Sequence, residues 1–339
     1  MKAAQVASQG KVSMVDVPRP NPGKGDVLVR MKCCGICGTD VEKVYGGGMP
    51  GKILGHEAVG EVEEVGPAVG GVWRGMRVFT HHHVGCGTCP ICKRGKPTYC
   101  LEYQKHNLSP CGLAESYIVP EFNVERGAVL ELPKALGYEE ASFIEPLATC
   151  ILALEGVDAK GAQSAMIYGA GPVGLLHLKM LQKYGVPRIA VGDTNEYRRT
   201  FVEKLGGDVT FDPTDPASKG TALGKMPDGP ELVVVATGNP AAFEDALRTV
   251  ARGGRVLLFG APPRGSSGTL DLSQFFLNGT HIITSYAATE KETRLAMDLL
   301  IQRDVVVSDL ITHKFALSET EKAFAAAVEL KCMKVLVKN

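Results

Sequence analysis

Aromatic residues are scarce in this chain of 339 residues. Phe, Trp and Tyr together make up 6% of the sequence, and Trp73 is its one tryptophan. Few aromatic residues fall in the segments that we expect to line a cleft. Pockets for apolar ligands are usually walled by aromatic and aliphatic side chains. The scarcity therefore favours a hydrophilic ligand.

The sequence also lacks net charge, because 37 Lys and Arg residues balance 37 Asp and Glu residues. No basic stripe or polybasic tail is present, which argues against nucleic acid and membrane surfaces as partners. No apolar run approaches the roughly 20 residues of a membrane span. The start of the chain lacks the apolar core of a secretion signal. We expect a cytoplasmic protein with no nucleic-acid or membrane partner.

Cysteine, in contrast, is abundant, with ten residues. Four of them follow the spacing C-x2-C-x2-C-x7-C, namely Cys86, Cys89, Cys92 and Cys100. Four thiolates this close can surround one tetrahedral zinc ion and leave no open position, which defines a structural site. The alternatives are disulfides or free thiols, and a reducing compartment disfavours disulfides. Cys33, Cys34, Cys111, Cys150 and Cys332 lack such spacing, so we expect them to be small apolar residues.

A second group of metal-capable side chains lies between residues 33 and 57. Cys37, His56 and Glu57 offer a thiolate, an imidazole and a carboxylate, a set that suits a zinc-like ion. A lone Cys with a His is more often structural. Thr39 and Asp40, however, lie only two and three residues after Cys37. Metal-bound histidines commonly donate their second N–H to a carboxylate, and Asp40 is suited to accept it.

A dinucleotide-binding pattern opens the second half of the chain. The apolar run 165–168 predicts a buried strand, and an apolar helix follows through Leu181. Between them lies a G-x-G-x-x-G loop, made of Gly169, Gly171, Pro172, Val173 and Gly174 with Ala170. Its glycines allow a tight turn and let backbone N–H groups approach a pyrophosphate at the helix N-terminus.

An acidic residue closes this pattern. Asp193 follows the next strand, nineteen positions after Gly174. It can accept both ribose hydroxyls of NAD and would repel the 2′-phosphate of NADP. Arg198 is either a contact to the adenosine or a solvated helix charge. Further buried runs at 232–238 and 255–260 predict parallel strands, whose carboxyl ends place Thr237 and Gly260 along the nicotinamide half of the crevice. We expect residues 281–286 to form the last strand of this sheet and residues 334–338 a final strand in the tail.

These motifs resemble those of the zinc-dependent medium-chain alcohol and polyol dehydrogenases, close to sorbitol and threonine dehydrogenases, over essentially the whole chain. The resemblance implies an α/β protein with two domains. A GroES-like β-rich catalytic domain would comprise 1–149 and 287–339, with a structural-zinc lobe at 86–100. A Rossmann domain with a doubly wound parallel sheet would comprise 150–286. The resemblance also implies one catalytic and one structural zinc per chain and a homo-oligomer, a tetramer or a dimer.

The resemblance gives Glu145 a role that its position alone does not. Polyol dehydrogenases carry a Glu-Pro-Leu run here, and that Glu binds the catalytic zinc, so Cys37, His56 and Glu145 are the implied ligands. Glu57 would then be a base beside the metal or a ligand that exchanges with water. Thr39 would accept the substrate proton. Relatives usually have His after the Thr/Ser-Asp-Val triplet, and this chain has Glu42. Either Glu42 takes over the proton exit or the proton leaves by another route.

The run His81–His83 has three interpretations: a metal site, a polar pocket wall or a solvated loop. Neighbouring side chains on a strand point to opposite faces, so adjacent histidines alone are a poor metal site. In relatives the segment before the cysteine lobe lines the substrate pocket. The pocket wall and the solvated loop both stay open.

The sequence therefore predicts an NAD-linked, zinc-dependent dehydrogenase of a secondary alcohol, a sugar alcohol or related polyol. An L-threonine 3-dehydrogenase is the first alternative, since residues 193–198 are close to the corresponding run in bacterial threonine dehydrogenases. Against it, residues 145–148 lack their Asp-Pro-x-Gly-Asn run. An alternative of another class is a catalytically silent nucleotide-binding relative with a structural role.

Overall fold

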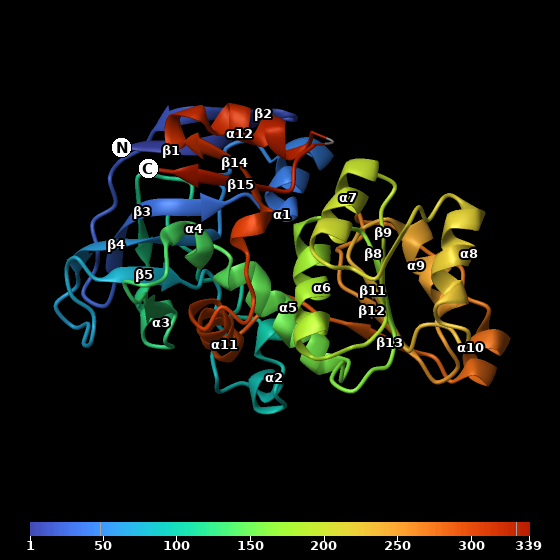
Figure 1. Cartoon of the computed structure of the whole chain (residues 1–339). Coiled ribbons are helices and arrows are strands. Elements are labelled where there is room, and N and C mark those ends of the chain that lie inside the picture. The colour runs from blue at the N-terminus through green and yellow to red at the C-terminus, as the bar shows by residue number, and fades with distance from the viewer. Residues whose placement is uncertain (48, 330) are drawn as a thin grey trace. The chain divides into compact units, whose positions relative to one another are not determined.

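The computed structural model describes residues 1–47, 49–329 and 331–339. The chain forms two compact units (Figure 1). Unit 1 comprises Met1–Ala148 and Ala288–Asn339, and unit 2 comprises Thr149–Ala287. The chain thus leaves the first unit once and returns to it.

Unit 2 is built on a parallel sheet with the strand order β10-β9-β8-β11-β12-β13. Its strands are short and continuous in apolar residues, as expected where both faces are covered. Their bounds are β8 Ala165–Tyr168, β9 Ile189–Gly192, β10 Val209–Phe211, β11 Leu232–Val235, β12 Arg255–Leu258 and β13 His281–Thr284. The strand order reverses between β8 and β11, so the carboxyl ends of these two strands flank the topological switch point.

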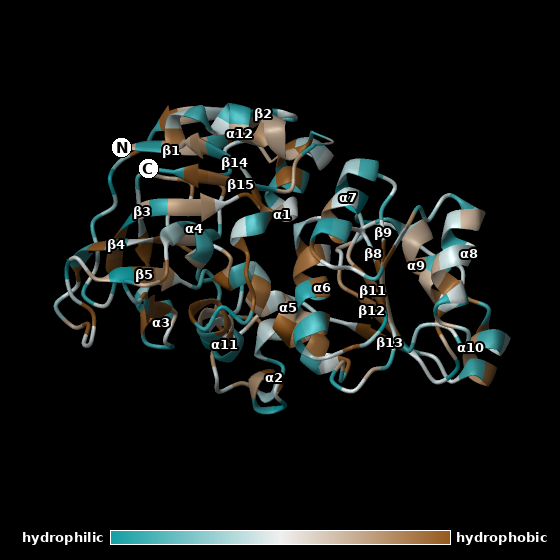
Figure 2. Ribbon diagram, in the orientation of Figure 1, coloured by the Kyte–Doolittle hydropathy of each residue, from teal (hydrophilic) through white to brown (hydrophobic). Residues whose placement is uncertain are grey.

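Helices cover both faces of this sheet. They are α6 Pro172–Lys183, α7 Glu196–Lys204, α8 Pro216–Gly224, α9 Pro240–Thr249 and α10 Leu272–Asn278. Figure 1 shows α6 on one side of the sheet and α8 and α9 on the other. In Figure 2 the central strands of this unit are mainly brown, whereas teal residues lie on the outward faces of the helices. Burial of the apolar strands between two helical layers stabilises the unit.

Unit 1 is rich in β-structure. Its main sheet runs β14-β15-β3-β4-β5-β7, with β6 also paired to β3. These strands are β3 Val27–Gly35, β4 Glu57–Val65, β5 Arg77–Thr80, β6 Ser116–Val119, β7 Val129–Glu131, β14 Ile311–Ala316 and β15 Lys334–Lys338. A separate antiparallel pair joins β1 Lys2–Ser8 to β2 Lys11–Asp16. The strands β14 and β15 come from the C-terminal segment, so the returning chain completes the sheet that the N-terminal segment begins.

Short helices connect the strands of unit 1. They are α1 Gly38–Val41, α2 Pro90–Lys93, α3 Glu121–Val124, α4 Tyr138–Ala141, α5 Ile144–Gly156, α11 Glu290–Ile301 and α12 Thr320–Ala327, with a π-helical turn η1 at Glu42–Gly46 and 3-10 turns η2 Pro97–Tyr99, η3 Ser308–Leu310 and η4 Leu317–Glu319. The helix α5 begins in unit 1 and ends in unit 2. Buried Val29, Met31, Leu113, Tyr117 and Phe324 belong to the apolar core of unit 1.

One predicted strand needs correction at its end, and another has a neighbour that was not predicted. The strand expected to reach Tyr286 ends at Thr284, and Ala287 then adopts a left-handed conformation with φ of 57°. The final strand also has a neighbour, β14, that the sequence pattern did not suggest, because its half-buried residues do not alternate clearly between apolar and polar. The final strand itself, Lys334–Lys338, has the predicted bounds.

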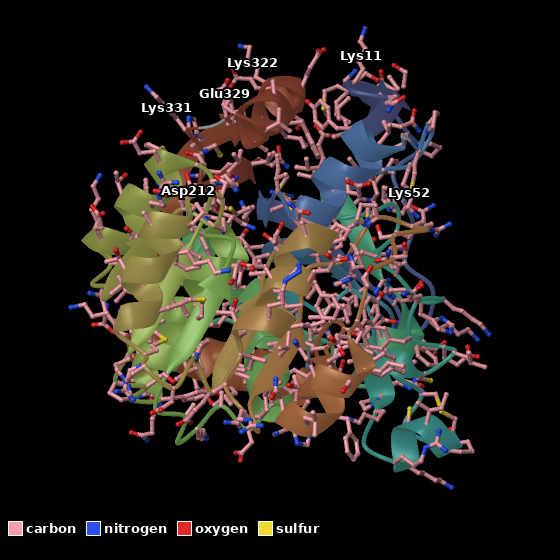
Figure 3. All side chains as sticks on the ribbon, turned by 90° about the vertical axis from the view of Figure 1, so that its right-hand side faces the viewer. Lys11, Lys52, Asp212, Lys322, Glu329 and Lys331 are labelled. Carbon is pink, nitrogen blue, oxygen red and sulfur yellow. The ribbon has the colours of Figure 1, made fainter. Side chains whose placement is uncertain are left out.

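Among the described residues, no helix is both long and apolar enough to cross a membrane. Charged side chains of both signs lie at the surface, and Figure 3 shows Lys11, Lys322 and Glu329 at the periphery of the molecule. The balanced charge of the sequence is thus spread as mixed signs over the surface.

Candidate active site and metal centres

The four cysteines of the C-x2-C-x2-C-x7-C motif come together in unit 1. Their sulfur atoms all lie within 4.8 Å of one another. The Cys86 and Cys92 sulfurs are 3.9 Å apart, and those of Cys89 and Cys100 are 3.7 Å apart. A tetrahedral zinc with Zn–S bonds of about 2.3 Å holds its sulfurs about 3.8 Å apart. The donor set therefore fits one zinc ion with no open position.

Backbone N–H groups donate to several of these sulfurs. The Cys89 N–H donates to the Cys86 sulfur at 3.3 Å, and the Cys92 N–H donates to the Cys89 sulfur at 3.4 Å. Hydrogen bonds from Thr88 and the Cys89 N–H lower the pKa of Cys86 to about 5, whereas burial raises the pKa of Cys92 to about 12. No disulfide joins any of the described cysteines, which argues against the disulfide alternative. Cys33, Cys34, Cys111, Cys150 and Cys332 are buried, as predicted for small apolar residues.

A second donor set also forms within unit 1. Ligand atoms of Cys37, His56 and Glu57 lie within 4.8 Å of one another. Cys37 immediately precedes α1, and Glu57 opens β4, so the end of β3 and the start of β4 present the three groups together. A thiolate, an imidazole and a carboxylate suit a catalytic zinc with one further position. The third member of this set is Glu57, and Glu145 is not in it.

Glu57 is buried at 1% exposure and faces the ammonium group of Lys334. Its other oxygen, Oε1, accepts no hydrogen bond from the described residues. The Lys334 ammonium also donates to the Ile36 carbonyl at 3.1 Å. Burial lowers the pKa of Lys334, but the charges of Glu57, Cys37 and Glu145 together outweigh burial and raise it. A Cβ at Gly35 would lie 1.9 Å from Glu57 Oε2, so a residue without a side chain is required there.

Glu145 lies near the same cluster, close to the start of α5. It is buried, and burial raises the pKa of its carboxyl group. The charges that act on it belong to His56, Glu57, His81 and Lys334. Glu145 is thus a neighbour of the Cys37, His56 and Glu57 set, and its role as a ligand stays a prediction.

Asp40 is fully buried, and its Oδ2 lies 3.4 Å from His56 Nδ1. Burial opposes its ionisation, but the positive charge and hydrogen bond of His56, together with Lys43 and the Cys37 N–H, outweigh burial and lower the pKa of Asp40 to about 2. This geometry is the predicted one, in which a carboxylate orients a metal-binding histidine. Thr39 and Glu42 are exposed, and Glu42 begins the η1 turn.

The run His81–His83 folds against this cluster. His81 and His82 are buried, and His83 is half-buried. The rings of His56 and His82 have centroids 5.0 Å apart. Burial lowers the pKa of His83 to about 3 and that of His82 well below its usual value, so both rings are neutral. Their burial excludes the solvated-loop interpretation for His81 and His82. The described residues give no metal-binding set of three that includes them.

In unit 2 the glycine loop joins β8 to α6. Gly169 has a φ of 100°, which favours glycine. A Cβ at Gly174 would lie 1.8 Å from the Gly169 carbonyl oxygen, so close packing of loop and helix requires glycine there too. Gly171 is the N-cap of α6, and no side chain caps the first N–H groups of this helix. These N–H groups are suited to a pyrophosphate.

The other predicted nucleotide residues gather at the same edge of the sheet. Gly169 and Gly260 both lie against Thr237. A Cβ added to Gly169 would contact the Thr237 side chain, and a Cβ added to Gly260 would lie 2.3 Å from the Thr237 backbone. Asp193 accepts N–H groups from Ala170 and Asn195, each at 2.8 Å. The Arg198 guanidinium lies 3.8 Å from the Asp193 carboxylate. The fold thus holds the acidic residue against the loop, with Arg198 beside both.

Sequence reasoning missed three residues that organise these sites. Lys334 gave no signal, because a lysine at the head of an apolar strand is ordinary. Asn123, fully buried, donates its side-chain amide to the carbonyls of His81, His82 and His106. Tyr103 is buried beside the histidine run, and its hydroxyl donates to the Ala288 carbonyl at 2.5 Å. All three act through partners distant in sequence.

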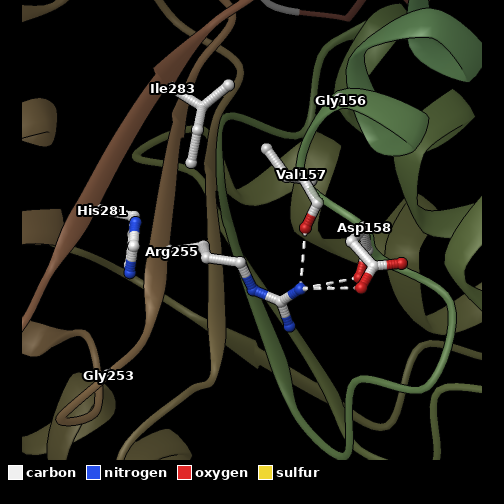
Figure 4. Close-up of a pocket in the computed structure, with 7 residues that line it drawn as sticks. All are labelled: Gly156, Val157, Asp158, Gly253, Arg255, His281 and Ile283. Atoms are coloured by element: carbon white, nitrogen blue, oxygen red, sulfur yellow. Dashed lines mark hydrogen bonds and ion pairs between the residues drawn. The ribbon is translucent and has the colours of Figure 1, made fainter.

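A surface hollow of about 460 Å³ lies elsewhere in unit 2 (Figure 4). Arg255 and His281, the first residues of β12 and β13, line it, and Arg255 donates to the carbonyls of Val157 at 2.8 Å and Asp158 at 2.7 Å. The hollow therefore lies at the amino ends of the strands, whereas the glycine loop follows a carboxyl end. None of the predicted site residues lines it.

Comparison with known proteins matches two family models. Residues 23–134 match the alcohol dehydrogenase GroES-like domain, and residues 172–302 match the zinc-binding dehydrogenase model. The L-threonine 3-dehydrogenase of Photorhabdus laumondii is 30% identical over 334 residues, which cover 96% of this chain and 95% of that one. The predicted GroES-like and Rossmann fold is thereby confirmed.

Solved structures agree over the full length. A chain from Sinorhizobium meliloti described as a zinc-binding dehydrogenase, bound to NADP, is 26% identical with a TM-score of 0.88 and covers 100% of this chain and 99% of its own. An alcohol dehydrogenase from Escherichia coli CFT073, complexed with NADH, is 25% identical with the same TM-score and the same coverage. Two zinc-suited donor sets in unit 1, a dinucleotide loop in unit 2 and these matches together show that the chain belongs to the zinc-dependent medium-chain alcohol dehydrogenase family.

Proposed function

We propose that this chain is an NAD-linked dehydrogenase of a hydrophilic secondary alcohol, a sugar alcohol or related polyol. The observation that carries the proposal is the Cys37, His56 and Glu57 set with Glu145 beside it. A bound zinc would supply Lewis acidity that lowers the pKa of an alcohol hydroxyl, as it does for water, from about 16 toward 7. Cys37 and His56 would hold the ion, with Glu145 or Glu57 as the carboxylate ligand.

The ion pair of Glu57 and Lys334 bears on that choice. The negative charge of Glu57 is already compensated by the buried ammonium group of Lys334, without a metal ion. Glu145 is also buried, but the charge of Lys334 affects its pKa less than the charges of His56, Glu57 and His81 do. This difference favours Glu145 as the standing ligand and Glu57 as the carboxylate that exchanges with water. Asp40 keeps His56 in the orientation that binding needs.

The chain also offers a path for the proton. Thr39, exposed next to Cys37, is suited to accept the substrate proton. Glu42 is exposed one turn later and would pass it to solvent in place of the usual histidine. Replacement of Glu42 by Gln should slow turnover more at low pH than at high pH, where hydroxide can collect the proton. A pH–rate profile identical to that of the wild type would remove Glu42 from the path.

NAD is the proposed cofactor. When bound, NAD accepts the hydride, and the protein orients it. The Asp193 carboxylate is fixed at the end of β9 by two backbone N–H groups, where it would meet the ribose hydroxyls. The relatives leave the choice open, since one solved neighbour carries NADP and another NADH.

L-Threonine is the second candidate substrate. The curated relatives with this name are 29 to 30% identical over nearly the whole chain. Threonine is itself a secondary alcohol with a polar neighbour, so the same zinc chemistry applies. A site built to hydrogen-bond a hydroxyl rejects analogues without it, by about 10⁴-fold in favourable cases. The two substrates should therefore be well separated by kcat/KM.

The test is NAD reduction with one panel under one condition. The panel contains sorbitol, xylitol, inositols, 2,3-butanediol, L-threonine, ethanol and benzyl alcohol, with the zinc content measured in parallel. We expect a polyol to lead and simple primary alcohols to trail by orders of magnitude. Ethanol or benzyl alcohol in the lead would overturn the polyol proposal, and L-threonine in the lead would select the second candidate. No turnover by a chain with two zinc ions would select the silent relative.

We also propose that the chain forms a homo-oligomer through β13 and α10. The strand β13 is the last in its sheet and has no outer partner among the described residues. On α10, Leu272, Phe276 and Leu277 are 71%, 82% and 65% exposed. Residues 271–286 carry one formal charge, Asp271. Equivalent residues meet across a two-fold axis, so a nearly uncharged apolar segment fits a second copy of itself without repulsion.

A further inference from the structure

Four aromatic rings in unit 1 run from one zinc-suited donor set toward the other. We call His56, His82, His83 and Tyr103 the ring row. The centroids of His56 and His82 are 5.0 Å apart, those of His82 and His83 are 4.1 Å apart, and those of His83 and Tyr103 are 5.4 Å apart. The distances of 5.0 and 5.4 Å lie within the roughly 4.5–7 Å at which aromatic rings pack against each other, and the 4.1 Å between His82 and His83 is slightly shorter.

Both ends of the ring row are tied to a donor set. His56 is itself a member of the Cys37, His56 and Glu57 set. At the other end, the Tyr103 N–H donates to the carbonyl of Cys100, a member of the four-cysteine set, at 2.9 Å. The Glu102 N–H also donates to the Cys100 sulfur at 3.4 Å. The conformation of residues 100–103 therefore depends directly on the four-cysteine site.

The surroundings of the ring row leave little freedom. Tyr103 and His82 are 1% and 7% exposed. The Tyr103 hydroxyl is held by the Ala288 carbonyl, and the carbonyl of His82 by the amide of Asn123. Nδ1 of His82 is buried and has no hydrogen-bond partner among the described residues. The imidazole of His82 packs against the rings of His56, His81 and His83.

We propose that the ring row mechanically couples the two zinc sites. Zinc in the four-cysteine site fixes Tyr103, and Tyr103, through the rings of His83 and His82, fixes His56 in the orientation that binds the second zinc. His82 and Tyr103 are thus positioning residues for the metal centre. The inference rests on the proposed function in one respect, the assignment of His56 as a zinc ligand.

The test is the release of zinc to a chelator, resolved into one phase for each site. His82→Ala removes a ring from the row, and His82→Phe keeps a ring but removes both nitrogens. Loss of partners that orient a ligand typically weakens metal binding by about 10- to 100-fold. We expect His82→Ala to release the zinc of the Cys37 and His56 site about tenfold faster or more, and His82→Phe to stay close to the wild type. The four-cysteine phase should not change in either variant.

Tyr103→Leu, with Tyr103→Phe as its ring-retaining counterpart, tests the far end of the row. Tyr103→Leu should accelerate the same phase as His82→Ala, and Tyr103→Phe should do so less. His281→Ala, an exposed histidine in unit 2, is the matched control. Circular dichroism and a thermal melt identify variants that lose the fold, and the Phe variants then carry the comparison.

The outcomes are separable. If His82→Phe releases zinc as fast as His82→Ala, the imidazole nitrogens matter, and positioning by packing is wrong. If His82→Ala and Tyr103→Leu leave both phases unchanged, the coupling is wrong while the proposed function stands. If the wild-type chain holds only the four-cysteine zinc, the proposed function and the coupling both fail.

Discussion

At the scale of single residues, the active-site cluster depends on a compensated charge. Glu57 and Lys334 are both nearly inaccessible to solvent and face each other. Removal of one partner of a buried ion pair commonly costs about 3–5 kcal/mol, because the other charge is left without compensation. Glu57 was visible in the sequence beside His56, but its partner comes from the far end of the chain. Under the proposed function, Lys334, a residue outside the motif, bears on the choice between Glu57 and Glu145 as the zinc ligand.

Asp193→Ser should narrow or reverse the preference of the chain for NAD over NADP. The serine removes the charge that repels a 2′-phosphate, and Arg198 is already beside this position. The measurement is the ratio of kcat/KM for the two cofactors with the best substrate. Asp208→Ser is the matched control, because Asp208 also accepts a backbone N–H, from Ile189 at 2.9 Å, at the other end of β9. A wild-type enzyme that uses NADP better would refute the interpretation of Asp193.

At the scale of elements, α6 carries both the dinucleotide loop and a buried histidine. His177 donates from Nδ1 to the Val173 carbonyl at 2.8 Å, if that nitrogen carries the proton, and Nε2 has no hydrogen-bond partner among the described residues. Burial lowers the pKa of His177 to about 4. The unfolded chain, with a histidine pKa of about 6.5, therefore binds this proton first on acidification. Stability should fall between pH 6.5 and pH 4.

His177→Leu should reduce this acid sensitivity. Between pH 7 and pH 5, the folded state keeps His177 neutral while the unfolded state becomes protonated, a difference of about 2 kcal/mol. Hydrogen exchange at amides of β8 and α6 measures the free energy of opening. The decrease in this free energy from pH 7 to pH 5 should be smaller in His177→Leu than in the wild type, by about that amount. His281→Leu, at an exposed position in the same unit, is the control. An unchanged pH dependence would contradict the burial argument.

The cysteine lobe is the second element whose behaviour can be predicted. Its short helix α2 and turn η2 bury few apolar side chains, so bound metal contributes directly to its folding. Cys89→Ala should lower the zinc content by about one equivalent per chain. Cys111→Ala is the matched control, because Cys111 is buried outside the donor set and its thiol donates to the Gly55 carbonyl at 3.0 Å. Metal analysis that finds unchanged zinc in Cys89→Ala would falsify the structural site.

At the scale of the whole molecule, unit 2 exposes apolar side chains on α10 and on the edge strand β13. Exposed edge strands and exposed apolar side chains are sites of association unless they are protected. The strand β13 contributes Ile282, which is 37% exposed, and α10 contributes Leu272, Phe276 and Leu277. Self-association through these residues is the proposed consequence for the whole molecule.

The pair of substitutions Phe276→Glu and Ile282→Glu should therefore reduce the mass of the particle in solution. Each places a carboxylate in a face that would meet itself across a two-fold axis, and like charges in contact repel. Light scattering after size exclusion measures the mass. Leu101→Glu is the control, because Leu101 is 78% exposed but lies in the cysteine lobe. A wild-type chain that is monomeric at micromolar concentration would remove the basis for this proposal.

Much of the fold was accessible from local patterns. Apolar runs and turn-forming glycines correctly predicted three features. These are the strand Ala165–Tyr168, the glycine loop after it and the final strand Lys334–Lys338. Such signals survive because each is set by residues close together in sequence. The strand β14 was missed, because its half-buried residues lack a clear alternation and its place depends on β15.

Short-range patterns in the sequence set the chemistry available to this protein. The spacing of Cys86, Cys89, Cys92 and Cys100 fits a closed tetrathiolate, and the loop from Gly169 to Gly174 with Asp193 fits a dinucleotide, because both depend on short-range geometry. The way in which these groups are held follows from the tertiary fold. The fold set Lys334 against Glu57, Asp40 against His56, and a row of rings between the donor sets. These contacts join residues far apart in the chain, and their burial strengthens the interactions between charges by excluding water.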